Sequence, residues 1–477
     1  MPTIRVVNQP NKRHGHLAFN AIRESRWVVL SVVVITLFGP ALLTLQGLDA
    51  RRVNASPTMT GGAVMPAALP PSEDQTVHIP YFIDQGDMTS TLTLNNNMLN
   101  ASEATVTVFN SKGESFTAPT ITLPSQNIEL FNLRELTAAA RGDFHSGSVR
   151  VSYHGPSMAV TCQVSAASAI RHVAFESVET SPMEFASSRL DSIAWARDEE
   201  TRASAALTNT TTGTVTVNLN AGASVKSLTL SAHETQVIEL REFLENRQGA
   251  TATVIHIEHS GIPGAIIATG FALNEKTGFS CNLPFVDRAA AKTSQLAGAH
   301  VRLGRAAEKE GFPAGTRFSA PLLVANVGDA ATDAHVLVDY TDGGVVNRAD
   351  IAKLNLAPQE VRQVDLASEL ARRGIIGPVD DAGVDIKYSG EPGTVIARLT
   401  SVDKSSDFAF DVPVKDPLAE MLRVGGSYPW RLDNGYTTVL HLKNTIDKLV
   451  YALVQVRYAG GTYNLERLPL EPFQRSR

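Results

Sequence analysis

The chain has 477 residues, a formal net charge of −6, and a composition of 43% hydrophobic and 19% charged residues. Such a length exceeds what one hydrophobic core supports and predicts about three domains. A small negative net charge argues against the clustered basic surface that a nucleic-acid-binding protein needs. Two cysteines, Cys162 and Cys281, exclude a disulfide-rich scaffold and a multi-cysteine metal site.

The N-terminal region predicts export. Residues 1–26 form a basic tail, and residues 27–48 carry no charged side chain. As a helix the uncharged run would be about 33 Å long, enough to cross a membrane, and its basic flank predicts a cytoplasmic N-terminus. The competing interpretation is a signal peptide cut near Ala41 or Ala50. Both place the remaining chain outside the cytoplasm, either anchored in the periplasm or at the cell surface through residues 27–48, or secreted after cleavage.

Residues 49–76 contain prolines, glycines and small polar residues without periodicity, which predicts a flexible linker.

A short sequence motif, which we call the repeated phrase, then occurs three times, and each copy has two leucines ten positions apart. A short amphipathic helix is expected at the second leucine and a glycine is expected to end it. Repetition of this kind predicts tandem modules. The leucine pairs are Leu123 and Leu133, Leu230 and Leu240, and Leu356 and Leu366, and the glycines are Gly142, Gly249 and Gly374.

Hydrophobic alternation precedes each copy of the phrase and ends on an asparagine. Alternation with a period of two predicts strands that bury one face. A recurring aromatic residue near the start of the modules is expected to fill the space between two sheets. The asparagines are expected to bond local backbone at a turn. The aromatic residues are Tyr81, Trp195 and Trp430, and the asparagines are Asn95, Asn209, Asn326 and Asn444.

About seven strands and one short helix per module, separated by regular turn signals, predict two-sheet sandwiches. In strand count and spacing the modules resemble the immunoglobulin-like sandwiches of bacterial envelope and surface proteins. The predicted fold class is therefore mainly β, with tandem immunoglobulin-like modules after an N-terminal transmembrane helix or signal sequence. The predicted modules cover residues 77–180, 189–287, 298–416 and, incompletely, 425–477.

The two cysteines lie in different modules and on non-equivalent strands. An oxidising compartment would permit a disulfide between Cys162 and Cys281. We favour two separate buried thiols, because a free cysteine behaves as a small hydrophobic residue.

Few motifs suggest chemistry, and none occurs in the pattern that the chemistry needs. His256 and His259 would point to opposite faces of a strand, so a strand surface is expected rather than zinc ligation. The run Asp380–Asp385 lacks the spaced ligands of a calcium loop, so we expect an acidic turn. Ser146 and Ser260 lie outside a nucleophile-elbow pattern. The sequence therefore predicts no catalytic, cofactor-binding or metal-ligating residue.

A non-enzymatic exported envelope protein is the predicted function, in which the modules act structurally, in adhesion, or as a display for protein partners. The alternative is a carbohydrate or cell-wall binding protein that stacks sugars on exposed aromatic rings. A hydrolase with its site in the insertion between Gly304 and Gly315 is disfavoured, because that segment holds neither histidine nor serine. The expected partners are the membrane, through residues 27–48, and envelope proteins or glycans, but not nucleic acid.

The fourth module matches the first leucine of the phrase at Leu470, and the given sequence ends at Arg477. A half-sandwich leaves a sheet edge unprotected. We expect either a truncated chain, which we favour, or completion of the module by a strand from a partner.

Overall fold

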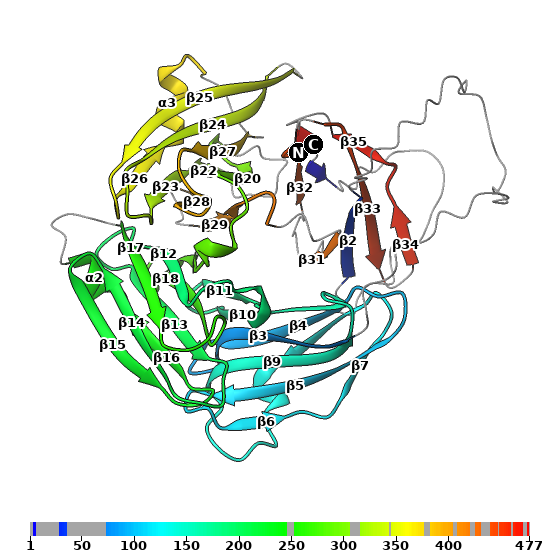
Figure 1. Cartoon of the computed structure of the whole chain (residues 1–477). Coiled ribbons are helices and arrows are strands. Elements are labelled where there is room, and N and C mark those ends of the chain that lie inside the picture. Colours follow the sequence, from blue (N-terminus) through cyan, green and yellow to red (C-terminus); the bar gives the residue numbers. More distant parts are fainter. Residues whose placement is uncertain are drawn as a thin grey trace, which may run out of the picture.

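The protein is described from a computed structural model, which is mainly β and arranges its antiparallel sheets around an arc (Figure 1). We refer to the successive groups of strands as modules 1 to 4. The structure describes residues 3–5, 28–35, 73–245, 252–305, 315–342, 345–375, 382–403, 408–419, 425–430, 439–446, 448–458, 461–470 and 475–476.

Module 1 packs two sheets around a core that includes Phe82, Leu92 and Val151. One sheet has the order β3-β9-β5-β6, with β7 also beside β5, and the other has the order β11-β10-β4-β8. The elements are β3 (Glu73–Ile83), β4 (Thr89–Asn96), β5 (Ser102–Asn110), β6 (Ser115–Thr117), β7 (Ile121–Leu123), β8 (Ile128–Asn132), α1 (Leu133–Leu136), β9 (Ser146–Gly155), β10 (Val160–Ser168) and β11 (Val173–Val178).

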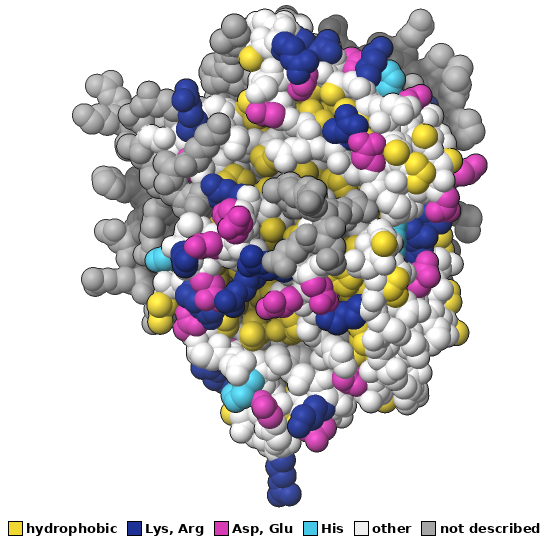
Figure 2. Space-filling model, turned by 90° about the vertical axis from the view of Figure 1, so that its left-hand side faces the viewer, with side chains coloured by type: hydrophobic (Ala, Val, Ile, Leu, Met, Phe, Trp, Pro, Cys, Tyr) yellow, Lys and Arg dark blue, Asp and Glu magenta, His cyan; other side chains and the backbone are white. Residues whose placement is uncertain are grey.

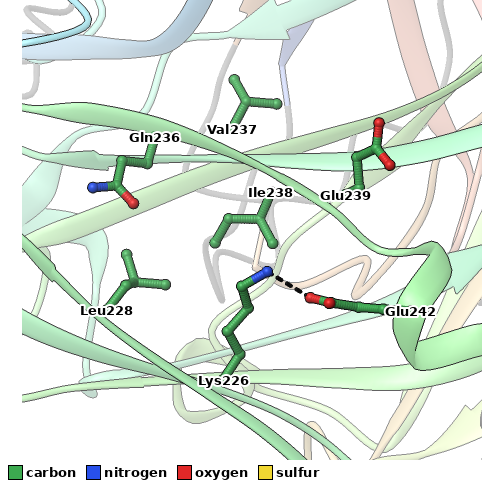
Figure 3. A pocket seen from close by; sticks show the side chains of 7 residues that line it. All are labelled: Lys226, Leu228, Gln236, Val237, Ile238, Glu239 and Glu242. Atoms are coloured by element: carbon green, nitrogen blue, oxygen red, sulfur yellow. Dashed lines mark hydrogen bonds and ion pairs between the residues drawn. The ribbon is translucent and has the colours of Figure 1, made fainter.

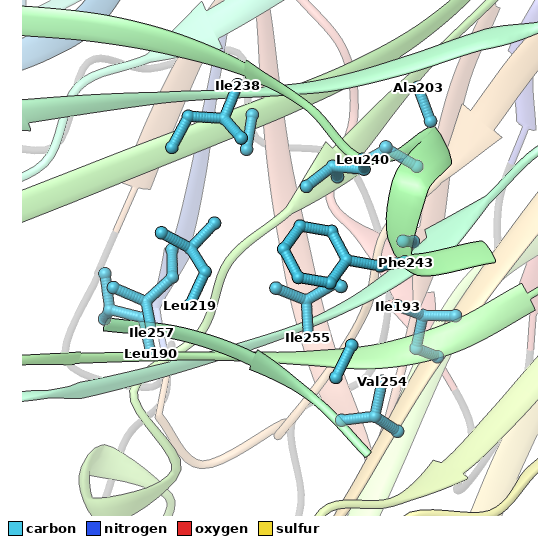
Figure 4. Close-up of a cluster of buried hydrophobic side chains, with 14 of the residues drawn as sticks. Leu190, Ile193, Ala203, Leu219, Ile238, Leu240, Phe243, Val254, Ile255 and Ile257 are labelled. Carbon is cyan, nitrogen blue, oxygen red and sulfur yellow. The ribbon is translucent and has the colours of Figure 1, made fainter. Parts of the chain in front are cut away.

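Module 2 repeats this arrangement, and Figure 4 shows Leu219, Ile255 and Phe243 converging in its core. Its sheets have the orders β12-β17-β14-β15 and β16-β13-β18-β19. A short 3-10 helix, η2 (Pro182–Glu184), leads into it. The other elements are β12 (Arg189–Trp195), β13 (Arg202–Asn209), β14 (Val215–Ala221), β15 (Ser224–Leu230), β16 (Thr235–Glu239), α2 (Arg241–Glu245), β17 (Ala252–His259), β18 (Ile266–Asn274) and β19 (Phe279–Pro284).

Module 3 is preceded by the 3-10 helix η3 (Arg288–Ala290) and has the sheets β25-β24-β27-β20-β30 and β21-β22-β28-β23-β26, with β29 beside β28. The elements are β20 (Gln295–Val301), β21 (Gly304–Arg305), β22 (Arg317–Ser319), β23 (Pro321–Asn326), β24 (Thr332–Asp342), β25 (Val345–Leu356), β26 (Val361–Asp365), α3 (Leu366–Arg372), β27 (Ala382–Tyr388), β28 (Val395–Asp403), β29 (Ala409–Val412) and β30 (Val414–Lys415).

The three helices lie where the repeated phrase predicts them, and the predicted glycine follows the end of α3 but not that of α1. Asn132 caps α1 and Asp365 caps α3, each accepting from two backbone N–H groups of the first turn. Gly374, with φ +76°, follows the C-cap of α3. α1 instead ends at Leu136, six residues before Gly142. Thr137 leaves the helical backbone with φ −93° and ψ 3°, and the Ala138 N–H donates to the Glu135 carbonyl with 3-10 spacing. Gly249 lies outside the described residues.

The N-terminal segment differs from the predicted helix. Val28–Ile35 forms a strand, β2, which suits a run of valine and isoleucine, because β-branched residues favour strands. It pairs with β31 and β33 of module 4, in the place that β9, β17 and β27 hold in the other modules. The rest of residues 27–48 lies outside the described residues. Among the residues that the structure describes, no helix is long and apolar enough to cross a membrane.

Module 4 completes the description with the sheets β31-β2-β33-β34, where β35 pairs with β33, and β1-β32-β36. Its elements are β1 (Thr3–Arg5), β31 (Gly425–Trp430), β32 (Val439–Lys443), β33 (Val450–Tyr458), β34 (Gly461–Asn464), β35 (Leu468–Leu470) and β36 (Arg475–Ser476).

The cysteines are unpaired and buried, as the sequence predicts. Cys162 lies in the core of module 1 and Cys281 in that of module 2. Burial raises the pKa of both thiols, that of Cys281 to about 11, so both stay protonated at neutral pH.

Candidate functional site at the module junctions

One asparagine per module ties the end of a strand to the first leucine of the repeated phrase. The side-chain amide of Asn209 donates to the Leu230 carbonyl at 3.2 Å. The same bond joins Asn326 to Leu356 and Asn444 to Leu470. In module 1 the bond to the Leu123 carbonyl comes from Asn96 rather than Asn95. The predicted asparagine is therefore wrong by one position in module 1. The reason is a bulge in β3 between Ile79 and Phe82, which adds one residue to the chain before Asn96 at the end of β4.

Replacing Asn326 by alanine is expected to destabilise module 3 by about 2–4 kcal/mol, since it leaves the carbonyls of Leu356 and Ala330 without their donor. Chemical denaturation followed by hydrogen exchange of β23 and β25 measures the loss. The matched control is Asn355→Ala, which removes an exposed bond to Asp333 and is expected to change stability by less than about 0.5 kcal/mol. Equal losses in both variants would contradict the role given to Asn326.

The recurring aromatic residues are buried, but in two different environments. Trp195 is 5% exposed and meets Phe279 edge-on in the core of module 2. Tyr81 stacks with Phe175 of its own module and Phe271 of module 2, with ring centroids 5.8 and 5.7 Å away. Tyr81 therefore packs a junction, and Phe82 fills the core instead. The side chain of Trp430 lies outside the described residues.

The second strands of modules 2 and 3 bury both of their faces. In β13, Ala205 and Leu207 point into their own core, whereas Ala206 packs against module 1 and the Thr208 hydroxyl donates to the Pro80 carbonyl at 2.6 Å. In β23, Leu322 and Val324 face the module 3 core, while Leu323 and Ala325 join the module 2 core. Module 2 thus rests on module 1, and module 3 on module 2.

The corresponding strand of module 1 has a different pattern. β4 alternates Leu92 and Leu94, which lie in the core, with Thr91 and Thr93 on the other face. Among the described residues no earlier module covers this face, so hydroxyl side chains suffice there. A polar outer face on the first repeat is typical of a capping repeat in an array.

Edge strands of successive modules run beside one another and cap each other's backbone. Ser280 and Asn282 of β19 accept from the N–H groups of Ala174 and Glu176 on β11. Asp411 of β29 accepts in the same way from the N–H of Asn282, at 2.6 Å. These contacts cover edges that would otherwise be open to pairing with another chain.

The turn after the first leucine of the phrase also contacts the preceding module. Gln126, His233 and Gln359 hold the same place in this turn, with φ of +53°, +57° and +62°. The ring of His233 stacks on Phe109 of module 1 at 4.5 Å. The side chain of Gln359 bonds the His256 ring of module 2. The left-handed turn therefore presents one long side chain to the neighbouring module.

A glycine marks the point where each connecting 3-10 helix touches the next module. Gly264 (φ +78°) and Gly393 (φ +81°) follow the strands β17 and β27, and an added Cβ at either would overlap the carbonyl oxygen of Pro182 or Arg288. The equivalent residue of module 1 is Met158, with φ +65°. Since no described segment connects into module 1 from an earlier module, a side chain fits there.

Buried charges lie at two of the junctions. Between modules 2 and 3, the Arg398 guanidinium lies 5.0 Å from the Trp195 ring and 3.2 Å from Asp411. Between modules 3 and 4, the Lys443 ammonium donates to Asp385 at 2.6 Å and lies 3.2 Å from Asp339. Arg348 contacts both carboxylates. Each of these groups has opposite charges around it, as burial requires.

The two motifs considered for metals are parts of these junctions. His256 and His259 lie on β17 and are 7% and 8% exposed, so the predicted strand surface is wrong. The His256 ring contacts Asp191, Arg189 and Gln359. Asp385 is buried beside Lys443, whereas residues 376–381 lie outside the described residues. In the part of the chain that the structure describes, no three His, Cys, Asp or Glu side chains gather as metal ligands.

A groove in module 2 lies between the edge strands β15 and β16, with a volume of about 480 Å³ (Figure 3). Leu228, Val237 and Ile238 are among its lining residues, and Lys226, which also lines it, pairs with Glu242 at 2.6 Å. Both ionised groups are about half exposed.

On the face shown in Figure 2, side chains of both charges are interspersed with hydrophobic ones. The groove itself holds one ion pair, Lys226 with Glu242. One solvated ion pair supplies neither a nucleophile with its base nor a pair of perturbed acids.

No protein-family model, curated protein or solved structure gives a significant match to this chain. The junctions therefore have to be interpreted from their own geometry.

Proposed function

We propose that the chain is a non-enzymatic envelope protein whose immunoglobulin-like modules form one stiff, curved array outside the cytoplasm. The observation that carries this proposal is that the same module positions make the contact at successive junctions: the second strand, the closing edge strand, the left-handed turn and the glycine. Neighbouring domains move relative to one another unless their interface is large and hydrophobic. Here hydrophobic clusters are shared between modules 1 and 2 and between modules 2 and 3. An array of this kind suits a structural spacer, or a rigid support for adhesion or protein display.

Small-angle X-ray scattering of the full chain at neutral pH tests the stiffness. We expect the measured scattering curve to match the curve calculated for one rigid particle with the module arrangement of Figure 1. A curve that only an ensemble of swinging modules reproduces would overturn the proposal. Carbohydrate binding by Tyr81 or Trp195 would require exposed rings, and both are buried.

Export is the second part of this proposal, and the uncharged run 27–48 between basic residues supports it. A retained helix would remove β2 from module 4 and leave the place between β31 and β33 to another strand. Cell fractionation with an intact-mass measurement is expected to give a membrane-bound protein of full mass, or a lighter exported one after cleavage. Recovery of the full-mass protein in the cytosol would contradict export.

A further inference from the structure

Histidines are concentrated where modules meet. His78 and His233 lie between modules 1 and 2, His256 lies between modules 2 and 3, and His300 stacks on His441 at 3.6 Å between modules 3 and 4. Because histidine changes its charge between about pH 5 and 8, such junctions can respond to acid.

The junction of modules 1 and 2 brings three basic side chains together from both modules. His78 on β3 is 5% exposed and pairs across the sheet with Arg150 on β9. His233 comes from the turn before β16 and stacks on Phe109 of β5 at 4.5 Å. The Arg150 guanidinium lies 5.2 Å from the same Phe109 ring. Docking of module 2 therefore adds a third basic group to a pair already formed in module 1.

Two carboxylates that lie close in sequence to these segments accept hydrogen bonds from other groups. Glu234, next to His233, accepts from the Ser231 N–H and the Gln236 amide. Glu179 precedes Thr180, which bridges to His78, and accepts from the Cys162 N–H at 2.6 Å. The charges that act on His78 come from Arg150 and His233, and the charge that acts on His233 comes from Arg150.

Burial, and then the charges of Arg150 and His233, lower the pKa of His78 from 6.5 to about 4. Burial and Arg150 also lower the pKa of His233. The docked junction therefore holds both rings in the neutral form. A second charge beside a fixed guanidinium in a desolvated site is unfavourable.

We propose that acidification releases module 1 from module 2 by charging His78 and His233 beside Arg150. This regulation rests on the proposed function, in which the modules form one stiff array. It adds a condition under which the first junction opens, so that the N-terminal module swings away.

The direction follows from proton linkage. A histidine whose pKa is lowered on docking binds fewer protons in the docked state, so docking is fully favourable above about pH 6.5 and weakens as the pH falls toward about 4. Each histidine changes the docking equilibrium by at most about tenfold per pH unit. Between pH 7.5 and 5, His78 alone therefore weakens docking by at most about 30-fold, the limit reached when undocking returns its pKa to 6.5.

The test uses the full chain at pH 7.5 and pH 5.0. Small-angle scattering reports the overall size, and hydrogen exchange, corrected for the intrinsic effect of pH, reports the Thr235 N–H, which bonds the Ser111 carbonyl across the junction at 3.1 Å. At pH 5.0 we expect a larger radius of gyration and a loss of at least tenfold in protection of Thr235. The core strands β13 and β17 are expected to remain protected.

Two variants assign the effect. His78→Gln with His233→Asn is expected to abolish the acid response, while Arg150→Met shifts its midpoint to lower pH and serves if the first variant does not dock at pH 7.5. The matched control is His154→Gln, which lies on β9 like Arg150 and whose side chain is 68% exposed. This control is expected to respond to acid like the unaltered chain. Modules that swing already at pH 7.5 would refute the stiff array. Docking that is equally firm at both pH values, or an acid response unchanged in the variants, would refute only the acid release.

Discussion

Lys443→Met is expected to destabilise the junction of modules 3 and 4 by about 3–5 kcal/mol, because it leaves Asp339 and Asp385 buried with one cation between them. Burial raises the pKa of Asp385 against the attraction of Lys443. For Asp339, burial is outweighed by Lys443 and Arg348, and the pKa is lowered. Chemical denaturation combined with hydrogen exchange of β24, β27 and β32 measures the loss.

Two controls separate charge balance from packing. Lys448→Met alters an exposed lysine of the same module and is expected to change stability by less than about 0.5 kcal/mol. Adding Asp385→Asn to Lys443→Met removes the excess negative charge, so we expect it to recover part of the loss. A double variant that is less stable than Lys443→Met would show that charge balance is not what Lys443 supplies.

Gly393→Ala is expected to cost about 2–4 kcal/mol and to loosen module 3 from module 2. An L-residue at φ +81° is strained by about 1–2 kcal/mol, and its Cβ would overlap the carbonyl of Arg288 in the connecting helix. Hydrogen exchange of β19 and scattering of the full chain check whether the loss falls at the junction. We expect Gly264→Ala to act in the same way between modules 1 and 2.

The control for this prediction comes from the equivalent place in module 1. Met158 already has φ +65°, so Met158→Ala keeps a Cβ there and meets no connecting helix. We expect it to change stability by less than about 0.5 kcal/mol. A loss in Met158→Ala as large as that in Gly393→Ala would mean that the turn itself, not the junction, sets the requirement.

The sequence predicts the mainly β class and the helix positions, because these depend on local patterns: alternation in the strands and the repeated phrase before each helix. It does not predict the junctions. A run such as Leu322–Ala325 indicates a strand buried on both faces, but not which module covers the second face. The sequence does show that β4 alternates threonine and leucine whereas Leu322–Ala325 in β23 is apolar throughout. Only the packing of the modules shows that this difference marks a strand covered by a preceding module.

Charged junction residues are harder still to predict. Lys443 and Asp385 are 58 positions apart, so neither has a neighbour in sequence that reveals its partner. His256 was assigned to a strand surface because period two places it opposite His259, and both are nevertheless buried. Trp195 and Tyr81 align in sequence, yet the β3 bulge moves Tyr81 out of the core.

One left-handed position differs between the modules: it holds Met158 in module 1 and glycine in modules 2 and 3. Glycine leaves room there for the connecting helix that leads into modules 2 and 3, whereas module 1 carries the side chain of Met158 at that place. Moving module 1 to an interior place would set a methionine against an incoming backbone carbonyl. The residue at this position therefore distinguishes a module that follows a connecting 3-10 helix from one that does not.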